Sequence, residues 1–412
     1  MPLSVLDVSL HGDSIGVLTR LPDDSTLFSF HENYVEHPSR PTLSLSFKQP
    51  SGELKLPKTT PTRGGKLPAF FSNLLPEGHM RTYLAQQAGV HPEREFYLLE
   101  QLGQDLPGAL TITPMLQQLA MLEAPSNEET SESNDGLFHF SLAGVQLKFS
   151  AVEAPQGGLT IPTRGIGGHW IVKLPSQRWA GVPENEYSMM VLAKAVGIPV
   201  PEMNLIPTHT VTGLPSELSH PGNASNSLAV KRFDRGENQT TIHMEDLAQV
   251  FGLYPHEKYK KVSYDNIARL LWLQAEELSV TLFIRLLVFN LAIGNGDAHL
   301  KNFSLLYPDT IHPILSPAYD LVATLPYMPE PTLALSLGGT KHMHEIGMSH
   351  FEALAKKAGI STNLVRQTVE EAVQQFQQAW ATHHSNLPMT EQVRQVIETH
   401  FSKVPLFAKN VV

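Results

Sequence analysis

The sequence predicts an α+β fold with two lobes, a β-rich first part and a mainly helical second part. Alternating apolar and polar residues recur before about residue 235, which predicts strands, whereas apolar residues at helical spacing dominate from Glu245 onward. An acidic segment almost without apolar residues interrupts the β-rich part. A length of 412 residues fits two or three domains at roughly 150 residues each. A β-rich block followed by an α-rich block suggests an enzyme with a cleft where the lobes meet.

The composition excludes several classes of protein. The chain contains no cysteine, so disulfides, thiolate zinc sites and a cysteine nucleophile are ruled out. A formal net charge of -10 argues against extensive direct binding to nucleic acid, which needs a basic surface. Residues 1–14 alternate like a strand rather than forming a signal peptide, and the longest apolar run, 282–294, is too short to span a bilayer. We therefore expect a cytoplasmic protein without a membrane partner.

A first module, rich in strands, is expected over residues 1–115. Residues 5–20 predict two strands around a Gly-Asp turn, and residues 26–31 continue the alternation. A helical stretch, opened by the sequence FFSNLLPEG, is expected over 70–90, and a turn at 105–110 closes the module.

The clearest boundary is a linker expected at 116–136. Its main part, LEAPSNEETSESNDG at 122–136, is acidic, rich in Ser and Asn, and almost without apolar residues after Pro125. A segment of this composition buries too little apolar surface to offset the conformational entropy that a chain loses on ordering. We therefore interpret the segment as a flexible linker or an exposed loop.

A small lobe is expected over residues 137–235. The alternation of apolar residues predicts strands at 137–152, 169–175 and 228–235. Residues 184–201 predict a helix, with Met189, Met190, Ala193 and Val196 on one face and Gly197 as its end.

A helical large lobe is expected over residues 236–412. The apolar run 282–294 is interpreted as a buried helix, and 365–380 as a helix with one apolar face. Between these helices, FSLLYPDTIHPIL predicts two short strands with a turn at Pro308-Asp309.

Two stretches in the middle of this region contain the candidate catalytic residues, GNGDAHLKNFSLLY at 294–307 and SPAYDLVAT at 316–324. Phosphoryl transfer needs a carboxylate to orient the attacking hydroxyl and oxygen ligands to hold magnesium on the phosphates. Protein kinases supply an Asp, an Asn five residues later and a second Asp beyond a short hairpin. Asp297, Asn302 and Asp320 have this arrangement, and their oxygens suit Mg²⁺. The pattern predicts a magnesium- and ATP-dependent phosphotransferase.

An alternative is that Asp297 is a turn or cap residue and Asn302 a solvent-facing polar residue. The Gly-Asp-x-His context and the correctly spaced Asp320 favour the catalytic interpretation. His299 has no second histidine at metal-binding spacing, so we expect His299, with Lys301, to support the catalytic loop. The same Gly-Asp-x-His-x-x-Asn pattern occurs in small-molecule kinases, so the motif defines the reaction better than the substrate.

The nucleotide side is expected on the small lobe. Lys173 ends an apolar strand, where a kinase-like lobe places a lysine against the α- and β-phosphates; a surface lysine at a strand end is the alternative. Glu186 is a possible carboxylate partner for it, although an acidic residue early in a helix also stabilises the helix dipole. Backbone groups from Lys231 to Phe233 could pair with adenine, although an ordinary edge strand would have the same pattern.

The sequence SLAGVQLK at 141–148 lies where a loop over the phosphates belongs. It has a single glycine, Gly144, and so matches neither the Walker pattern nor the usual glycine-rich kinase loop. An exposed hairpin turn is the alternative. As a phosphate loop it would bring Gly144, Val145 and Gln146 to ATP.

Taken in order, these pieces resemble the HipA family of bacterial serine/threonine kinases, the toxins of type II toxin–antitoxin systems. The resemblance spans nearly the whole chain and is carried by the following ordered set of motifs: FFSNLLPEG, SLAGVQLK, IVKLP, ENEY, VKRFDR, GDAHLKN and YDLVAT. It implies a two-lobed, protein-kinase-like fold with an additional β-rich N-terminal subdomain. It also implies Asp297 as catalytic aspartate, Asn302 and Asp320 as magnesium ligands, Lys173 at the ATP phosphates and Ser141 as an autophosphorylation site.

The resemblance further implies a function and partners. The substrate would be a Ser or Thr hydroxyl on a translation component, characteristically an aminoacyl-tRNA synthetase, whose phosphorylation arrests growth. A small helix-turn-helix antitoxin of HipB type would neutralise the kinase and carry it to operator DNA, so that DNA binding is indirect. Two alternatives stay open: a small-molecule kinase of the aminoglycoside or choline type, and a non-catalytic pseudokinase that acts as a binding module.

Overall fold

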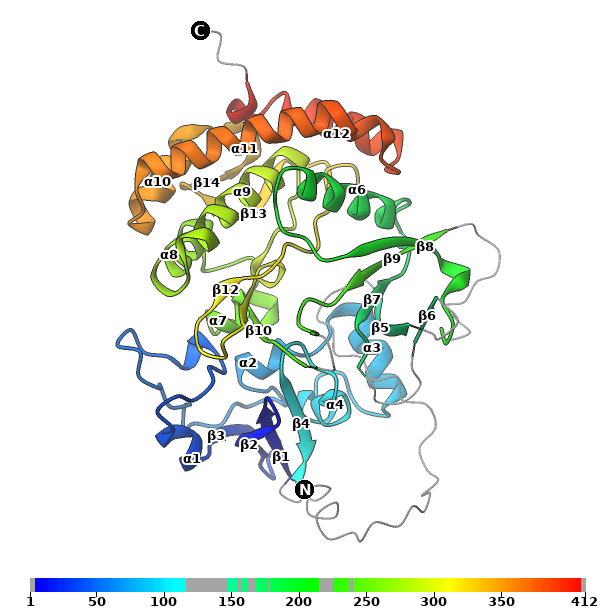
Figure 1. Cartoon of the computed structure of the whole chain (residues 1–412). Coiled ribbons are helices and arrows are strands. Elements are labelled where there is room, and N and C mark those ends of the chain that lie inside the picture. The colour runs from blue at the N-terminus through cyan, green and yellow to red at the C-terminus, as the bar shows by residue number, and fades with distance from the viewer. Residues whose placement is uncertain are drawn as a thin grey trace.

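The computed structural model describes residues 4–115, 147–153, 158–161, 167–176, 178–214, 225–236 and 240–408. Figure 1 shows two sheet-containing regions below and beside a layer of C-terminal helices, which confirms the predicted α+β fold class. None of the helices in these ranges is both long and apolar enough to cross a lipid bilayer.

The N-terminal region is built on a four-stranded antiparallel sheet in the order β3-β2-β1-β4. Its strands are β1 (Ser4–Leu10), β2 (Asp13–Arg20), β3 (Thr26–Phe30) and β4 (Leu110–Pro114). The predicted strands at 5–20 and 26–31 are therefore confirmed. The turn lies one residue earlier than expected, at His11 and Gly12, whose φ values of 53° and 89° are left-handed, as a two-residue hairpin loop requires.

Four helices accompany this sheet: α1 (Glu32–Glu36), α2 (Ala69–Ser72), α3 (Gly78–Gln87) and α4 (Glu95–Leu102). The helical stretch expected over 70–90 is broken between α2 and α3. Pro76 lies in this break, and a proline there removes an amide donor and disfavours helical geometry in the preceding residue. The break leaves the Asn73 and Glu77 side chains free to reach the large lobe.

The second sheet has five strands in the order β6-β5-β7-β9-β8. They are β5 (Lys148–Glu153), β6 (Leu159–Thr160), β7 (Trp170–Lys173), β8 (Met203–Pro207) and β9 (Asn226–Lys231). Helix α6 (Val182–Ala195) packs against β8 and β9, and Gly197, at φ 76°, follows its end as predicted. Of the strand expected at 137–152, only the end lies within the described residues, as the start of β5.

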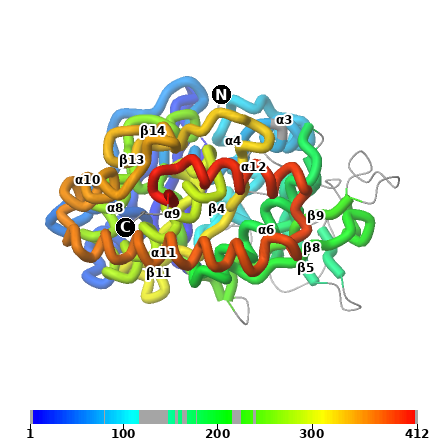
Figure 2. Tube along the Cα trace, turned by 90° about the horizontal axis from the view of Figure 1, so that it is seen from above, coloured from blue at the N-terminus to red at the C-terminus, as the bar shows by residue number. Residues whose placement is uncertain are grey.

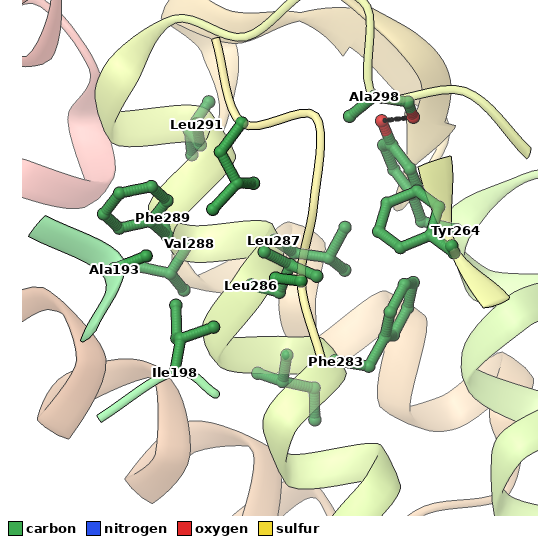
Figure 3. Packing of buried hydrophobic residues seen from close by; sticks show 14 of the residues in the cluster. Ala193, Ile198, Tyr264, Phe283, Leu286, Leu287, Val288, Phe289, Leu291 and Ala298 are labelled. Atoms are coloured by element: carbon green, nitrogen blue, oxygen red, sulfur yellow. Dashed lines mark hydrogen bonds between the residues drawn. The ribbon is translucent and has the colours of Figure 1, made fainter. Parts of the chain in front are cut away.

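The C-terminal region contains six helices within the described residues: α7 (Leu247–Val250), α8 (Tyr264–Gln274), α9 (Glu277–Ile293), α10 (Met348–Ala358), α11 (Thr362–His383) and α12 (Glu391–Phe401). The run at 282–294 forms the buried α9, as predicted, and α8, α11 and α12 all pack against it. Figure 3 shows the side chains of α9 packed against residues from neighbouring elements. Seen from above, α11 and α12 extend across this end of the molecule (Figure 2).

Short strands accompany these helices: β10 (His243–Asp246), β11 (Ser304–Tyr307), β12 (Ile314–Leu315), β13 (Thr332–Leu337) and β14 (Thr340–His342). The hairpin predicted around Pro308-Asp309 is confirmed as β11 and β12, and β10 pairs with β11. The hairpin β13–β14 was not expected in a region interpreted as helical. Its turn, Gly338-Gly339, has φ values of 58° and 104°, which only glycine adopts readily.

Two hydrophobic cores hold the molecule together. One is the large-lobe core around α9, which also includes α6. The other joins the N-terminal region to the five-stranded sheet, since Phe71 and Leu98 belong to the same buried cluster as Phe149, Trp170 and Val172. The boundary expected at 116–136 lies outside the described residues, and the core is continuous from one side of it to the other.

Candidate active site

The loop after α9 is held by its own polar groups. Gly294 ends the helix at φ 67°, and a Cβ there would lie 2.4 Å from Leu325 Cδ1. Thr324 Oγ1 accepts a hydrogen bond from Gly296 N at 2.8 Å, and Asn295 Oδ1 accepts one from Asp297 N at 3.0 Å. These contacts fix the backbone that presents Asp297.

Asp297 is half-buried, and its carboxylate accepts a hydrogen bond from one side chain of the described residues. The Tyr259 hydroxyl donates to Asp297 Oδ1 at 2.6 Å. Burial raises the pKa of the Asp297 carboxyl, and the Tyr259 hydrogen bond opposes that rise. The carboxylate is therefore held by Tyr259 on one oxygen while its backbone stays fixed.

The two residues expected to support this loop, His299 and Lys301, make different kinds of contact. The His299 ring packs edge-on against Tyr259 with centroids 5.0 Å apart, and burial lowers the pKa of His299 to about 3, so the ring is neutral at pH 7. His299 Nδ1 is buried without a hydrogen-bond partner in the part of the chain that the structure describes. Lys301 Nζ donates to Asn73 O at 2.8 Å and lies 3.3 Å from Asp246 Oδ2 and 3.5 Å from Glu77 Oε1. Lys301 thus ties the catalytic loop to the break between α2 and α3.

Lys173 and Asp320 meet across the two lobes. Lys173 Nζ lies 2.5 Å from Glu186 Oε1 and also contacts Asp320 Oδ1, so the suggested Lys173–Glu186 pair is present. Burial favours the neutral acid at Asp320, but the Lys173 ammonium outweighs it and holds the pKa of Asp320 well below its ordinary value. Burial raises the pKa of Glu186, with Lys173 opposing.

The backbone of Asp320 is itself unusual. Its φ of 52° is left-handed, a conformation that few residues other than glycine adopt. Such strained positions gather at functional sites, where the surrounding structure maintains them. Here the conformation brings the carboxylate to Lys173.

A cavity of about 890 Å³, including its open mouth, lies where the two lobes and the N-terminal region meet. Its wall combines apolar and charged side chains. The apolar or aromatic residues include Leu74, Pro107, Ile171, Val230, Phe233, Met244 and Tyr319, and the charged ones include Lys148, Lys173, Glu186, Asp246, Lys301 and Asp320.

The structure brings several predicted residues to this one cavity. Lys173, Lys231, Phe233, Lys301 and Asp320 all line it. The Lys231 ammonium pairs with Glu202 at 3.2 Å, and the Phe233 ring packs on Tyr319 with centroids 5.7 Å apart.

Three other predicted residues that the structure describes, Asp297, His299 and Asn302, are not among those that line this cavity. Asp297 and His299 face Tyr259 on the adjoining loop. Ser141, Gly144, Val145 and Gln146 lie outside the described residues.

The side-chain oxygens of Asn302 and Asp320 are of the type that magnesium prefers. Within the described ranges, no three His, Asp or Glu side chains form a ready-made metal cluster. Magnesium, however, is usually held by only one or two carboxylates together with substrate phosphates and water. Asn302 Oδ1 is buried without a hydrogen-bond partner among the described residues, and Lys173 favours the ionised form of the Asp320 carboxylate. An unpartnered amide oxygen and a carboxylate are a hard-oxygen donor set of the required kind.

Sequence reasoning missed residues that act through long-range contacts. Arg232 Nη1 lies 2.7 Å from Asp105 Oδ1 and Arg232 Nη2 2.9 Å from Asp234 Oδ2, and all three side chains are buried. The network joins the turn at 105–110 to the segment after β9, which lines the cavity. The paired charges of the RFDR motif at 232–235 are visible in the sequence. Their partner Asp105 could not be identified from the sequence, because it lies more than a hundred residues earlier in the chain.

Lys148 was also not assigned to the nucleotide site. It pairs with Lys173 across β5 and β7 and lines the same cavity. Burial lowers the pKa of the Lys148 ammonium. The sequence signal was its place at the end of SLAGVQLK, where β5 begins.

A strand lysine that is paired with a helix glutamate, and an Asp that follows a hairpin, line one interlobe cavity. The loop that carries Asp297 and Asn302 reaches this cavity through Lys301. Together these features define the class of kinase-like phosphotransferases. Comparison with known families gives the particular family. Residues 6–113 match the HipA N-terminal domain, and residues 140–380 match the HipA-like C-terminal domain. The chain therefore belongs to the HipA family of kinases.

Individual relatives agree with this assignment. A Sinorhizobium fredii protein with the provisional name kinase Y4dM is 48% identical, over 98% of each chain. The serine/threonine-protein kinase toxin HipA of Shewanella oneidensis is 25% identical, over 82% of each. A solved structure of the Shewanella oneidensis HipA and HipB with operator DNA matches with a TM-score of 0.72 at 22% identity, covering 97% of this chain and 95% of that one. This last likeness concerns the fold.

Proposed function

We propose that this protein is a serine/threonine protein kinase that uses ATP and magnesium. The observation that carries the proposal is the Lys173 ammonium, held between Glu186 and Asp320 on the wall of the interlobe cavity. A buried lysine at this point presents a fixed positive charge to phosphate groups, and Asp297 follows on the adjoining loop.

Each residue then has a defined role. Lys173 and Lys148 bind the α- and β-phosphates, and the adenine lies against Phe233 near the backbone of Lys231. Asn302 and Asp320 hold magnesium, which neutralises negative charge on the phosphates. Asp297 orients the acceptor hydroxyl and receives its proton.

Labelling with γ-labelled ATP, Mg²⁺ and a bacterial lysate tests the proposal. We expect a labelled protein band with the wild type and on the order of a thousandfold lower rate with Asp297→Asn, since a transition-state contact is lost. Asp297→Asn should still bind Mg-ATP, whereas Asp320→Asn should lose both activity and magnesium-dependent binding. A labelled metabolite would instead indicate a small-molecule kinase, and no labelled product a pseudokinase.

We further propose that the kinase is a cytoplasmic toxin that phosphorylates a translation component, such as an aminoacyl-tRNA synthetase. A small helix-turn-helix antitoxin of HipB type would be its partner, because the structural relative was solved with HipB and operator DNA. The net charge of -10 supports indirect DNA binding through that partner. Tight, salt-sensitive binding of the isolated chain to random duplex DNA would contradict this.

Finally, we propose that Ser141 is an autophosphorylation site that regulates the enzyme. The support is the match of SLAGVQLK to the family loop, and the place of Lys148, at the end of this stretch, on the cavity wall. A phosphate on Ser141 adds close to two negative charges, which would repel the phosphates of ATP. Intact-mass and peptide analysis after incubation with Mg-ATP should find phosphate at Ser141 in the wild type, but not in Ser141→Ala or Asp297→Asn. Unchanged ATP affinity of the phosphorylated form would contradict the regulatory role.

A further inference from the structure

Residues 258–264, which we call the brace, run along the catalytic loop. They follow the short 3-10 helix Pro255–Glu257 and lead into α8. Tyr259 of the brace makes two contacts with the loop. Its hydroxyl donates to Asp297 Oδ1 at 2.6 Å, and its ring packs edge-on against His299 at 5.0 Å between centroids.

The same segment contacts the two other residues of this stretch of the loop. The buried Tyr264 hydroxyl donates to Ala298 O at 2.8 Å, which Figure 3 shows as a dashed line. Leu300 N donates to Lys258 O at 3.3 Å. Four consecutive loop residues, 297 to 300, are therefore each held by the brace.

Tyr259 is in turn anchored away from its hydroxyl. Its carbonyl accepts a hydrogen bond from Lys341 Nζ of β14 at 3.4 Å, and Lys258 Nζ lies 5.6 Å from the centre of its ring. Lys258 Nζ also pairs with Glu77 Oε2 at 2.9 Å. Tyr259 nevertheless has 40% of its surface exposed, so it combines a fixed position with access to solvent.

The hydrogen bond from Tyr259 engages one of the two oxygens of the Asp297 carboxylate. Tyr259 is its single side-chain hydrogen-bond donor in the described parts of the chain, and it binds Oδ1. The other oxygen, Oδ2, remains available to an incoming hydroxyl. A carboxylate that rotates freely would present this oxygen only part of the time.

We propose that Tyr259 is a positioning residue that orients Asp297 toward the acceptor hydroxyl and forms part of the wall of the acceptor site. This inference rests on the proposed kinase function. Because its ring and carbonyl are fixed, and because Tyr259 does not line the cavity that holds Lys173, we treat its hydroxyl as a support for Asp297 and not as a phosphate acceptor.

The test compares wild type with Tyr259→Phe, which removes only the hydroxyl. We expect kcat for labelling of the lysate protein to fall by about 10- to 100-fold, the order of loss that a misplaced catalytic group causes. The KM for ATP and the Kd of a non-hydrolysable ATP analogue with Mg²⁺ should stay unchanged. The thermal midpoint of unfolding should also stay unchanged, since the ring contacts remain.

Tyr254→Phe is the matched control. Tyr254 lies five residues upstream and stacks on His256, with centroids 5.9 Å apart. This variant should label at the wild-type rate.

Three results would overturn the inference. The first is a Tyr259→Phe variant with wild-type kcat while the wild type labels protein, which would leave the proposed function standing. The second is phosphate on Tyr259 in peptide analysis, which would make that hydroxyl an acceptor. The third is a wild-type chain that transfers no phosphate, which would overturn the proposed function and this inference together.

Discussion

Glu245 is a carboxyl group with an incomplete set of partners between the N-terminal region and the large lobe. Its Oε1 accepts hydrogen bonds from Leu45 N at 2.9 Å and from the Tyr307 hydroxyl at 2.5 Å, but Oε2 is buried without a close hydrogen-bond donor among the described residues. Burial raises the pKa of Glu245 to about 7 from an ordinary 4.5, with the hydrogen bonds opposing. The folded protein therefore prefers the neutral acid at this position.

This shift predicts how stability depends on pH. Because the folded-state pKa is the higher one, the contribution of Glu245 to stability is fully present below pH 4.5 and is lost as the pH rises through 7. The loss amounts to about 3 kcal/mol at most. Urea unfolding at pH 5 and pH 8 should show that wild type loses more free energy of unfolding between these values than Glu245→Gln does.

Titration of the neighbouring His243 does not affect the comparison between wild type and Glu245→Gln. Burial lowers the pKa of His243 to about 4, so its own contribution is lost as the pH falls below about 6.5, equally in both proteins. Parallel pH profiles of the two proteins would show that Glu245 ionises freely in the fold.

The C-terminus of α9 is the element on which the candidate active site depends most. Gly294 has φ 67° and also lies where a side chain would collide with Leu325. Gly359, at the end of α10, has φ 75° but open space around it. The two glycines have the same backbone strain and differ in packing.

The two helix ends therefore make a matched pair of mutations. Gly359→Ala should lower the free energy of unfolding by about 1 kcal/mol, the cost of a left-handed alanine. Gly294→Ala should cost about 1–3 kcal/mol more because of overpacking, and should also lower phosphoryl transfer by moving Asp297. Denaturant unfolding and the labelling assay measure both effects. Equal losses in the two variants would mean that the packing at Leu325 relaxes freely.

Elements with a strong local pattern were predictable. The hairpin β1–β2, the buried α9 and the apolar face of α11 all follow from residue spacing, which acts within a few residues. The hairpin β13–β14 was missed although its Gly338-Gly339 pair is a turn signal, because both strands are short and lie among helices.

On the scale of the whole molecule, the N-terminal region and the five-stranded sheet depend on each other. Both contribute to one buried cluster that includes Phe71, Leu98, Phe149 and Trp170. Removing residues 1–115 would expose the Phe149 and Trp170 side of that cluster to water. An exposed apolar patch of this kind leads to aggregation.

We therefore expect a fragment of residues 137–412 to be insoluble or to lack a cooperative unfolding transition. Size-exclusion chromatography and circular dichroism with thermal unfolding would measure this. Shortening the acidic segment 122–136 in the full chain is the control, and its polar composition predicts that the fold tolerates it. A monodisperse, cooperatively unfolding fragment 137–412 would contradict the role of the shared core.

The reaction class and the α+β fold could be predicted from the sequence alone, because both are inferred from the spacing of residues along the chain. The five-residue interval between Asp297 and Asn302 and the periodicity of apolar residues are local properties that need no tertiary contacts. The contacts that complete the candidate site are different. Lys173 reaches Asp320, and Tyr259 reaches Asp297, only after distant segments have packed together. Such pairs are brought together by burial of apolar surface elsewhere in the chain, so only the folded structure could identify them.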